Sequence, residues 1–449
     1  MTPRSRMSAS ALRAAAAATA LAAAALGAQP LVPMQVVVSD KHACALHTVG
    51  VVTCWGYGPS LGIGLTSGYV GDAPNEMGEH LAAVDFGPGR YAVELIGAQY
   101  DTTIARLSDD TIVAWGSNNC KLPLFGGNVN NVGANRVPLN FGAGRTAISI
   151  AIGGSFLCVV LDNHQVKCMG GSGMTPASVP ENTVCTPGKT LDDIPPIDVG
   201  SHSLPIQVMA LGNTVCVLFE DGSVKCFGKA DGANNRLRTG STEDLYPRSA
   251  PASAFGDNLT RADLGVGKIE RLVGGPGVAC AVAEGGLVKC WGHGGWCMTG
   301  SDAVYTEMNF HDNDVQVSSS ADHVCTLANG DVRCYGANNY CQIGYGTTGT
   351  KICLPGSDGN RALESAPVNF GGRKARAIAT SYQKSCAMLE DHTLYCWGRG
   401  LDGVVGLGNT SMARVPSLVV FGTTDLAATS TVTNTSSTTS ATSSTSTVT

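Results

Sequence analysis

The chain has 449 residues, a formal net charge of −6 and only 14% charged residues. A nucleic-acid-binding protein needs clustered basic side chains to displace counterions. Here 29 basic residues are scattered among 35 acidic ones. We therefore expect no nucleic-acid partner. The chain also contains 17 cysteines, and the spacing of most of them organises the rest of the sequence.

Residues 1–28 have the three parts of a secretory signal peptide. Three arginines give a positive start, residues 14–26 form an apolar run, and the small residues Gly27 and Ala28 mark the expected cleavage region. The run is too short for an ordinary membrane span. An organellar transit peptide is the alternative, because the segment lacks acidic residues and is rich in Ser and Arg. Paired cysteines favour secretion, since disulfides persist in oxidising compartments.

Residues 216–228, CVLFEDGSVKCFG, have the pattern of a β-hairpin. If Cys216 lies opposite Cys226, the strands are joined by a three-residue loop. That loop ends on Gly222, where this kind of hairpin needs a left-handed residue. Directly opposed residues are about 4.5–5.5 Å apart at Cα, and a disulfide tolerates that distance. The pattern therefore predicts a disulfide across the hairpin.

The same pattern recurs along the chain. Five cysteine pairs are ten residues apart, and the sixth is nine apart with a two-residue loop, Asn329-Gly330, which keeps the sulfurs opposed. The longer loops have glycine or histidine at their third position, and both residues tolerate the left-handed region. The predicted disulfides are Cys44–Cys54, Cys158–Cys168, Cys216–Cys226, Cys280–Cys290, Cys325–Cys334 and Cys386–Cys396.

A seventh copy lacks the cysteines. We align it on Ala105 and Ala114, nine residues apart, with a two-residue turn at Asp109-Asp110. Every copy continues into a bulky residue followed by glycine, and we assign the bulky residue to the core between repeats. Each unit then has an irregular loop and further short apolar segments. Seven units of about four strands predict an all-β, seven-bladed β-propeller over residues 33–423.

A propeller must join its first blade to its last. Strand candidates at residues 34–39 and 415–421 lie near the two ends of the repeat region. We therefore expect these two strands to share a blade or to lie in adjacent blades.

Five cysteines lie outside the hairpins: Cys120, Cys185, Cys297, Cys341 and Cys353. Cys341 and Cys353 could close one long loop, and Cys120 and Cys185 could bridge neighbouring blades. That pairing would leave Cys297 alone, and other connectivities remain open.

Residues 424–449 are expected to form a disordered tail. From Thr429 to Thr449, 17 of 21 residues are Ser or Thr. Such a segment buries too little apolar surface to fold and is typical of an O-glycosylated stalk.

The pattern C-x-L-x-x-x-G-x-V-x-C-W-G, with loops such as YGANNYCQIGYG at residues 335–346, resembles the regulator of chromosome condensation repeat. The resemblance covers residues 36–421, is nearest to the cysteine-containing exported type, and implies a seven-bladed propeller. The family's histidine two residues before the first cysteine is present only at His42 and His323. Its post-hairpin loop pattern is eroded in units two to five.

Three classes of function remain. A secreted binding or scaffold protein would present propeller loops to a protein or glycan, as a secreted β-lactamase inhibitor protein with this fold does. Guanine-nucleotide exchange on a small GTPase, the activity of the family's namesake, requires a cytosolic or nuclear location. A secreted enzyme with its active site in propeller loops has no supporting motif. We favour the binding protein: secreted to the extracellular space or cell surface, monomeric, not an enzyme, and without a membrane span, cofactor, metal or catalytic residue.

The loops after each aromatic-Gly pair vary most in length and composition. Variable loops on a rigid scaffold usually carry recognition, and aromatic side chains suit interface anchors. The candidate binding surface consists of Tyr57, Tyr69, Trp296, Tyr340 and Tyr345. The alternative for each residue is that it packs over its own blade as loop core.

Overall fold

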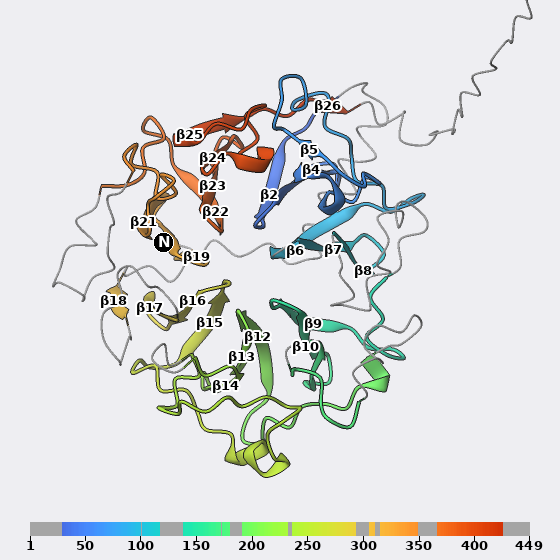
Figure 1. Ribbon diagram of the computed structural model, residues 1–449, viewed down its shortest axis with the longest axis vertical. Coiled ribbons are helices and arrows are strands. Elements are labelled where there is room, and N and C mark those ends of the chain that lie inside the picture. The colour runs from blue at the N-terminus through green and yellow to red at the C-terminus, as the bar shows by residue number, and fades with distance from the viewer. Residues whose placement is uncertain are drawn as a thin grey trace, which may run out of the picture.

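Seven small antiparallel sheets form a ring in the computed structural model, with one strand of each sheet at the centre (Figure 1). The structure describes residues 29–99, 101–116, 138–171, 173–179, 191–231, 236–292, 305–309, 315–348 and 366–424. The predicted fold class, an all-β seven-bladed propeller, is confirmed. No helix within the described ranges is long and apolar enough to cross a membrane.

Each blade is a meander of three or four short strands, numbered from the centre outwards. Blade 1 contains β2 (Pro33–Val38), β3 (His42–His47), β4 (Val52–Tyr57) and β5 (Tyr69–Val70), and blade 2 contains β6 (Ala92–Gln99), β7 (Thr102–Leu107) and β8 (Ile112–Gly116). Blade 3 contains β9 (Ala147–Ile152), β10 (Phe156–Leu161) and β11 (Val166–Gly170), and blade 4 contains β12 (Pro205–Leu211), β13 (Thr214–Phe219) and β14 (Val224–Gly228). Blade 5 contains β15 (Ile269–Gly274), β16 (Val278–Ala283), β17 (Leu287–Gly292) and β18 (Tyr305–Asn309). Blade 6 contains β19 (Gln316–Ser319), β20 (His323–Ala328) and β21 (Asp331–Gly336). Blade 7 contains β22 (Ala375–Ser381), β23 (Lys384–Leu389), β24 (Leu394–Gly398) and β25 (Ala413–Val419).

The prediction of intra-blade disulfides is confirmed. In blade 4 Cys216 lies opposite Cys226, as the loop length requires. The third loop position is left-handed in every ten-residue copy, with φ between 61° and 80°. The bonded pairs are Cys44–Cys54, Cys158–Cys168, Cys216–Cys226, Cys280–Cys290, Cys325–Cys334 and Cys386–Cys396.

The register predicted for the cysteine-free copy in blade 2 is wrong. Ile104, and not Ala105, lies opposite Ala114. The turn has three residues and ends on Asp110, whose φ of 66° is left-handed. Aspartate tolerates that conformation better than most residues, so a three-residue loop looked like a two-residue turn. Blade 2 therefore keeps the ten-residue spacing of the cysteine pairs.

The bulky residue after the second cysteine position is at most 5% exposed in all seven blades. Where it is tryptophan, its indole can also bond to the preceding blade in the ring. Trp397 Nε1 donates to the carbonyl of Gln342 (2.8 Å), and Trp55 Nε1 donates to the carbonyl of Val404 (2.8 Å). A Cβ on Gly344 would lie 2.9 Å from the Trp397 Nε1, so only glycine fits there without movement. The post-hairpin loops therefore help to hold neighbouring blades together.

The seam between blades 7 and 1 closes the ring. Strand β2 lies beside β22, so the prediction that the first and last strands occupy adjacent blades is confirmed. Arg376 Nη2 donates to the carbonyl of Met34 (3.0 Å), and the Phe421 ring packs 5.7 Å from the Trp55 ring. Outside the blades, β1 (Gln29–Pro30) pairs with β26 (Thr423–Thr424). The two ends of the repeat region are thus joined by backbone and side-chain contacts.

Candidate functional site

The meander of each blade sends its connections to two faces of the ring. Successive strands run in opposite directions, so the turn after the first strand and the loop after the third emerge at the same face. The hairpin turn between the second and third strands emerges at the other face. The predicted binding loops therefore share one face with the first turn of every blade.

Two of the candidate residues, Tyr57 and Tyr69, lie opposite each other at the ends of β4 and β5. Their ring centroids are 5.6 Å apart, and Lys41 Nζ lies 5.2 Å from the Tyr57 centroid. The negative charge of Asp402, from the short helix η8 (Leu401–Gly403) of blade 7, raises the pKa of the Tyr69 hydroxyl. Blade 7 thus contributes directly to this tyrosine pair.

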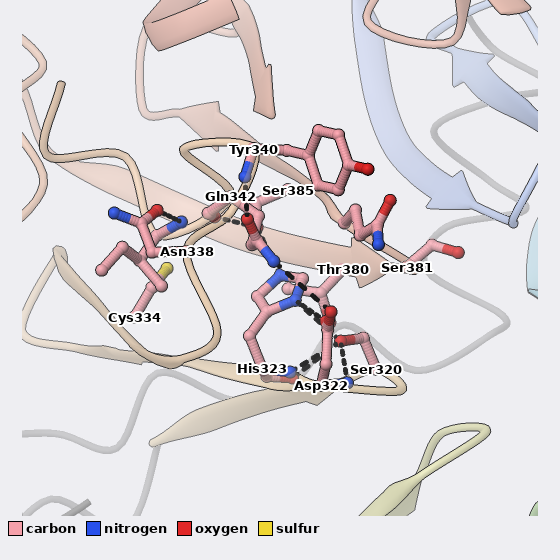
Figure 2. Close-up of polar contacts among 12 residues, drawn as sticks. Ser320, Asp322, His323, Cys334, Asn338, Tyr340, Gln342, Thr380, Ser381 and Ser385 are labelled. Atoms are coloured by element: carbon pink, nitrogen blue, oxygen red, sulfur yellow. Dashed lines mark hydrogen bonds and ion pairs between the residues drawn. The ribbon is translucent and has the colours of Figure 1, made fainter. Parts of the chain in front are cut away.

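Tyr340, after β21 of blade 6, also contacts blade 7. The Arg399 guanidinium lies 5.4 Å from the Tyr340 centroid, and its Nη1 donates to Gln383 Oε1 (3.1 Å). Figure 2 shows the Tyr340 ring directed away from the polar cluster around His323. A cation over an aromatic face gains about 0.5–1 kcal/mol at an exposed site, so Arg399 restrains the ring.

Three exposed apolar side chains on this face were not predicted. Leu65 is 38% exposed in the loop before β5, Tyr382 is 40% exposed in the β22–β23 turn, and Leu401 is 46% exposed in η8. Isolated hydrophobic residues in glycine-rich loops gave no signal in the sequence. We call the combined surface the tyrosine face; it comprises Lys41, Tyr57, Leu65, Tyr69, Asp101, Tyr340, Tyr382, Arg399, Leu401 and Asp402.

The remaining candidates have different outcomes. Tyr345 is half-buried and packs against the core shared by blades 6, 7 and 1, which fits the loop-core alternative. Trp296 lies outside the described residues.

Cys341 is a buried free thiol, so the pairing with Cys353 considered above is not made, and burial raises the pKa of the Cys341 thiol. The cysteines Cys120, Cys185, Cys297 and Cys353 also lie outside the described residues, as do residues 1–28 and 425–449.

The loops that carry the tyrosine face are fixed by internal contacts. The Glu76 carboxylate accepts hydrogen bonds from the backbone N–H groups of residues 71–73 (2.9–3.1 Å). Burial acts to raise the pKa of Glu76, but these bonds lower it overall. A Cβ on Gly403 would lie 2.6 Å from the backbone nitrogen of Asp72, so the loops of blades 1 and 7 interlock closely. This surface is therefore largely formed before any partner arrives.

A serine, a histidine and an aspartate meet between blades 6 and 7 (Figure 2). His323 Nε2 lies 2.8 Å from Ser385 Oγ, and His323 Nδ1 lies 3.1 Å from Asp322 Oδ1 and 2.8 Å from Ser320 Oγ. These distances match those of a hydrolytic triad. This cluster could not be anticipated from the sequence, because its members come from two blades.

Two observations argue against a catalytic role for this cluster. Ser385 is fully buried, and its Oγ donates its proton to the carbonyl of Gln342 (2.9 Å) and not to His323. The arrangement also recurs without the aspartate between blades 1 and 2. There His42 Nε2 contacts Thr103 Oγ1 (2.5 Å), and its Nδ1 contacts Ser39 Oγ (2.6 Å). We call this shared arrangement the histidine latch, since it joins one blade to the next.

The architecture defines the class of protein: a disulfide-bonded, seven-bladed propeller whose repeats resemble those of the regulator of chromosome condensation. No family model matches the chain. Human WBSCR16 has a similar structure, with a TM-score of 0.56 and 16% identity over 82% of this chain and 95% of that one. Yeast RCC1 (Prp20), solved bound to Kap60, gives a TM-score of 0.43 and 17% identity, over 86% of this chain and 74% of that one. The CRINKLY WD40 ectodomain of the Arabidopsis thaliana receptor kinase ACR4 gives a TM-score of 0.43 and 14% identity, over 86% of this chain and 99% of that one. At 16% identity the likeness to human WBSCR16 shows the fold alone.

Proposed function

We propose that the protein is a secreted, non-enzymatic binding scaffold that presents the tyrosine face to a protein or glycan partner. The observation that carries the proposal is the convergence on one face of exposed tyrosines and leucines from blades 1 and 7, beside the partly buried Tyr340 of blade 6. Contiguous exposed apolar surface rimmed by polar residues marks interaction sites, and tyrosine and arginine are favoured interface anchors. Because the loops are already fixed, binding loses little conformational entropy.

The disulfides support the proposed compartment. Six intra-blade bonds are typical of a protein that folds under oxidising conditions, and the leader-like residues 1–28 agree with export. Amino-terminal sequencing of protein recovered from the culture medium tests this part of the proposal. Retention inside the cell with the leader intact would contradict it.

A matched pair of leucines tests the binding face. Leu401 is 46% exposed on the tyrosine face, and Leu204 is 47% exposed beside a hairpin turn on the opposite face. We expect Leu401→Ala and Tyr69→Ala each to reduce capture of a partner from the secreted fraction, or binding to a glycan array, by tenfold or more. Leu204→Ala should bind like the unmodified protein.

All three variants should have the same melting temperature as the unmodified protein, because the altered side chains are exposed. Equal capture by Leu401→Ala and Leu204→Ala would place the binding surface elsewhere. Tyr345 is left unchanged in this design, since its substitution would disturb the core and confuse loss of binding with loss of folding.

A further inference from the structure

The innermost strands of the seven blades surround a central channel of about 370 Å³. Figure 1 looks down the ring, with β2, β6, β9, β12, β15, β19 and β22 directed toward the centre. Sites for small molecules have volumes of about 300–1,000 Å³ and are mainly apolar, with a few polar groups that orient the ligand. The channel has the size of such a site, and its lining combines apolar side chains with polar groups in similar proportion.

The apolar wall of the channel is incompletely buried. Five β-branched residues from five blades line it and remain half-buried: Val37, Ile96, Ile150, Val273 and Ile378. Apolar surface left accessible in a concave site gains free energy when a hydrocarbon group covers it. This wall therefore favours a ligand with an apolar body.

The wall of blades 6 and 7 carries hydroxyl groups. Ser318 Oγ and Thr380 Oγ1 bond to each other (3.0 Å), and Ser381 Oγ donates to Asp40 Oδ1 (3.1 Å). Ser319 also lines the channel, is only 6% exposed, and its Oγ has no hydrogen-bond partner. A buried hydroxyl without a partner is uncommon and costs free energy. A change of the Ser319 rotamer would bring this Oγ, which is inaccessible to water as it stands, to a ligand's hydroxyl or carbonyl group and satisfy it.

The channel lining is also uncharged. None of the described residues that line it is Lys, Arg, His, Asp or Glu. Moving an ionised head group from water into such a lining costs free energy, because no opposite charge in the lining pairs with it. We propose that the channel binds a neutral, single-chain amphiphile, with its hydroxyl or carbonyl head at Ser319 and its hydrocarbon chain along the Val and Ile wall. This site is separate from the tyrosine face and does not depend on the proposed function.

The first test compares two probes that differ in their head groups. Protein purified from the secreted fraction is titrated with 1-decanol and with decanoate at pH 8, and binding is measured by displacement of Nile red and by calorimetry. We expect decanol to bind at micromolar concentration and decanoate at least tenfold more weakly. Absence of decanol binding would overturn the proposal, and equal affinities would overturn the neutral head group.

Gly97 offers a way to block the channel without damaging the fold. It lines the channel, a Cβ built on it meets no heavy atom within 4 Å, and its φ is not left-handed. Gly97→Leu should therefore fold normally and reduce decanol affinity at least tenfold. Unchanged decanol affinity in a folded Gly97→Leu protein would contradict the site.

A matched pair on β9 and a head-group variant complete the test. Ile150 lines the channel, whereas Ile148, two residues earlier, is 47% exposed and lies outside the lining. Ile150→Gln should weaken decanol binding about tenfold, and Ile148→Gln should leave it unchanged. Ser319→Ala should weaken decanol about threefold while leaving decanoate unaffected. Equal effects of the two isoleucine variants would rule out the channel even if Gly97→Leu fails to fold.

Discussion

The histidine latch joins blades 1 and 2 and blades 6 and 7, but its surroundings differ. Between blades 6 and 7, Gln342 ties the latch to the overlying loop: its carbonyl accepts from Ser385 and Trp397, and its Nε2 donates to Asp322 Oδ2 (3.4 Å). Between blades 1 and 2 the latch is reduced to Ser39, His42 and Thr103. Both junctions share a histidine bonded to a serine of its own blade and to a hydroxyl of the next blade, which blade packing explains. The aspartate that completes a triad-like geometry between blades 6 and 7 is therefore not evidence of catalysis.

The largest effect is expected from removing the indole at the blade 6–7 junction. Trp397 is fully buried, and Trp→Ala in a core costs about 3–5 kcal/mol of unfolding free energy. Trp397→Phe keeps most of the volume, leaves a small cavity and loses the bond to Gln342, which still accepts from Ser385, so it should cost far less. Urea unfolding with the disulfides intact measures both changes. Similar losses for the two variants would show that the indole N–H, and not its bulk, stabilises this junction.

The two junctions also differ in the hairpin disulfide, which blade 7 has and blade 2 lacks. Blade 7 has Cys386–Cys396, whereas blade 2 has Ile104 opposite Ala114. Replacing Cys386 and Cys396 by alanine should destabilise the protein by about 2–3 kcal/mol. Ile104→Cys with Ala114→Cys should form a hairpin bridge in blade 2 like those of the other six blades, detected by non-reducing peptide mapping. Ala105→Cys with Ala114→Cys is the control and should stay reduced; a bridge there would restore the register expected from the sequence.

The blade 2 register shows how far the sequence could lead. Cysteine spacing identifies the hairpins because the sulfurs, the loop length and a left-handed third residue must agree. Without cysteines, Ser108-Asp109-Asp110 looked compatible with two registers. In the structure the N–H and Oγ of Thr111 both donate to Asp109 Oδ1, as those of Ser223 do to Asp221, and this shared Asp-x-Ser/Thr turn is the local signal for a three-residue loop.

The tyrosine face was only partly predictable. Tyr57, Tyr69 and Tyr340 could be named from their loops. The contact of Arg399 with Tyr340 and the approach of Asp402 to Tyr69 depend instead on how blades 6, 7 and 1 close around the ring.

The latch of blades 1 and 2 should make stability depend on pH. Burial, with the charge of Lys384 acting in the same direction, lowers the pKa of His42 to about 3, whereas an unfolded histidine titrates near 6.5. Between these values the unfolded chain binds the proton and the native protein does not, so stability falls as pH decreases from 6.5 toward 3. The contribution approaches about 1.4 kcal/mol per pH unit.

His42→Gln tests this dependence while keeping a hydrogen-bonding group near Thr103. The slope of unfolding free energy against pH between 6 and 4 should decrease by the contribution of one proton. Burial also lowers the pKa of His47 to about 3, so His47 should still contribute to the pH dependence of stability in the variant. An unchanged slope would mean that His42 is protonated in the native protein.

The smallest effect is expected from the surface ion pair that spans blades 1 and 2. Lys41 Nζ lies 3.2 Å from Asp101 Oδ2, with side chains 48% and 23% exposed. Burial acts to lower the pKa of Lys41, but Asp101 raises it overall. Exposed pairs of this kind contribute about 0.2–1 kcal/mol and weaken in salt. A double-mutant cycle with Lys41→Met and Asp101→Asn should give a coupling in that range that decreases at high ionic strength. Lys41→Met also loses the contact of Nζ with the Tyr57 ring, but that loss occurs with and without Asp101 and therefore cancels in the cycle. A coupling above about 2 kcal/mol would show that this pair, and not the buried latch, is the main electrostatic link between the two blades.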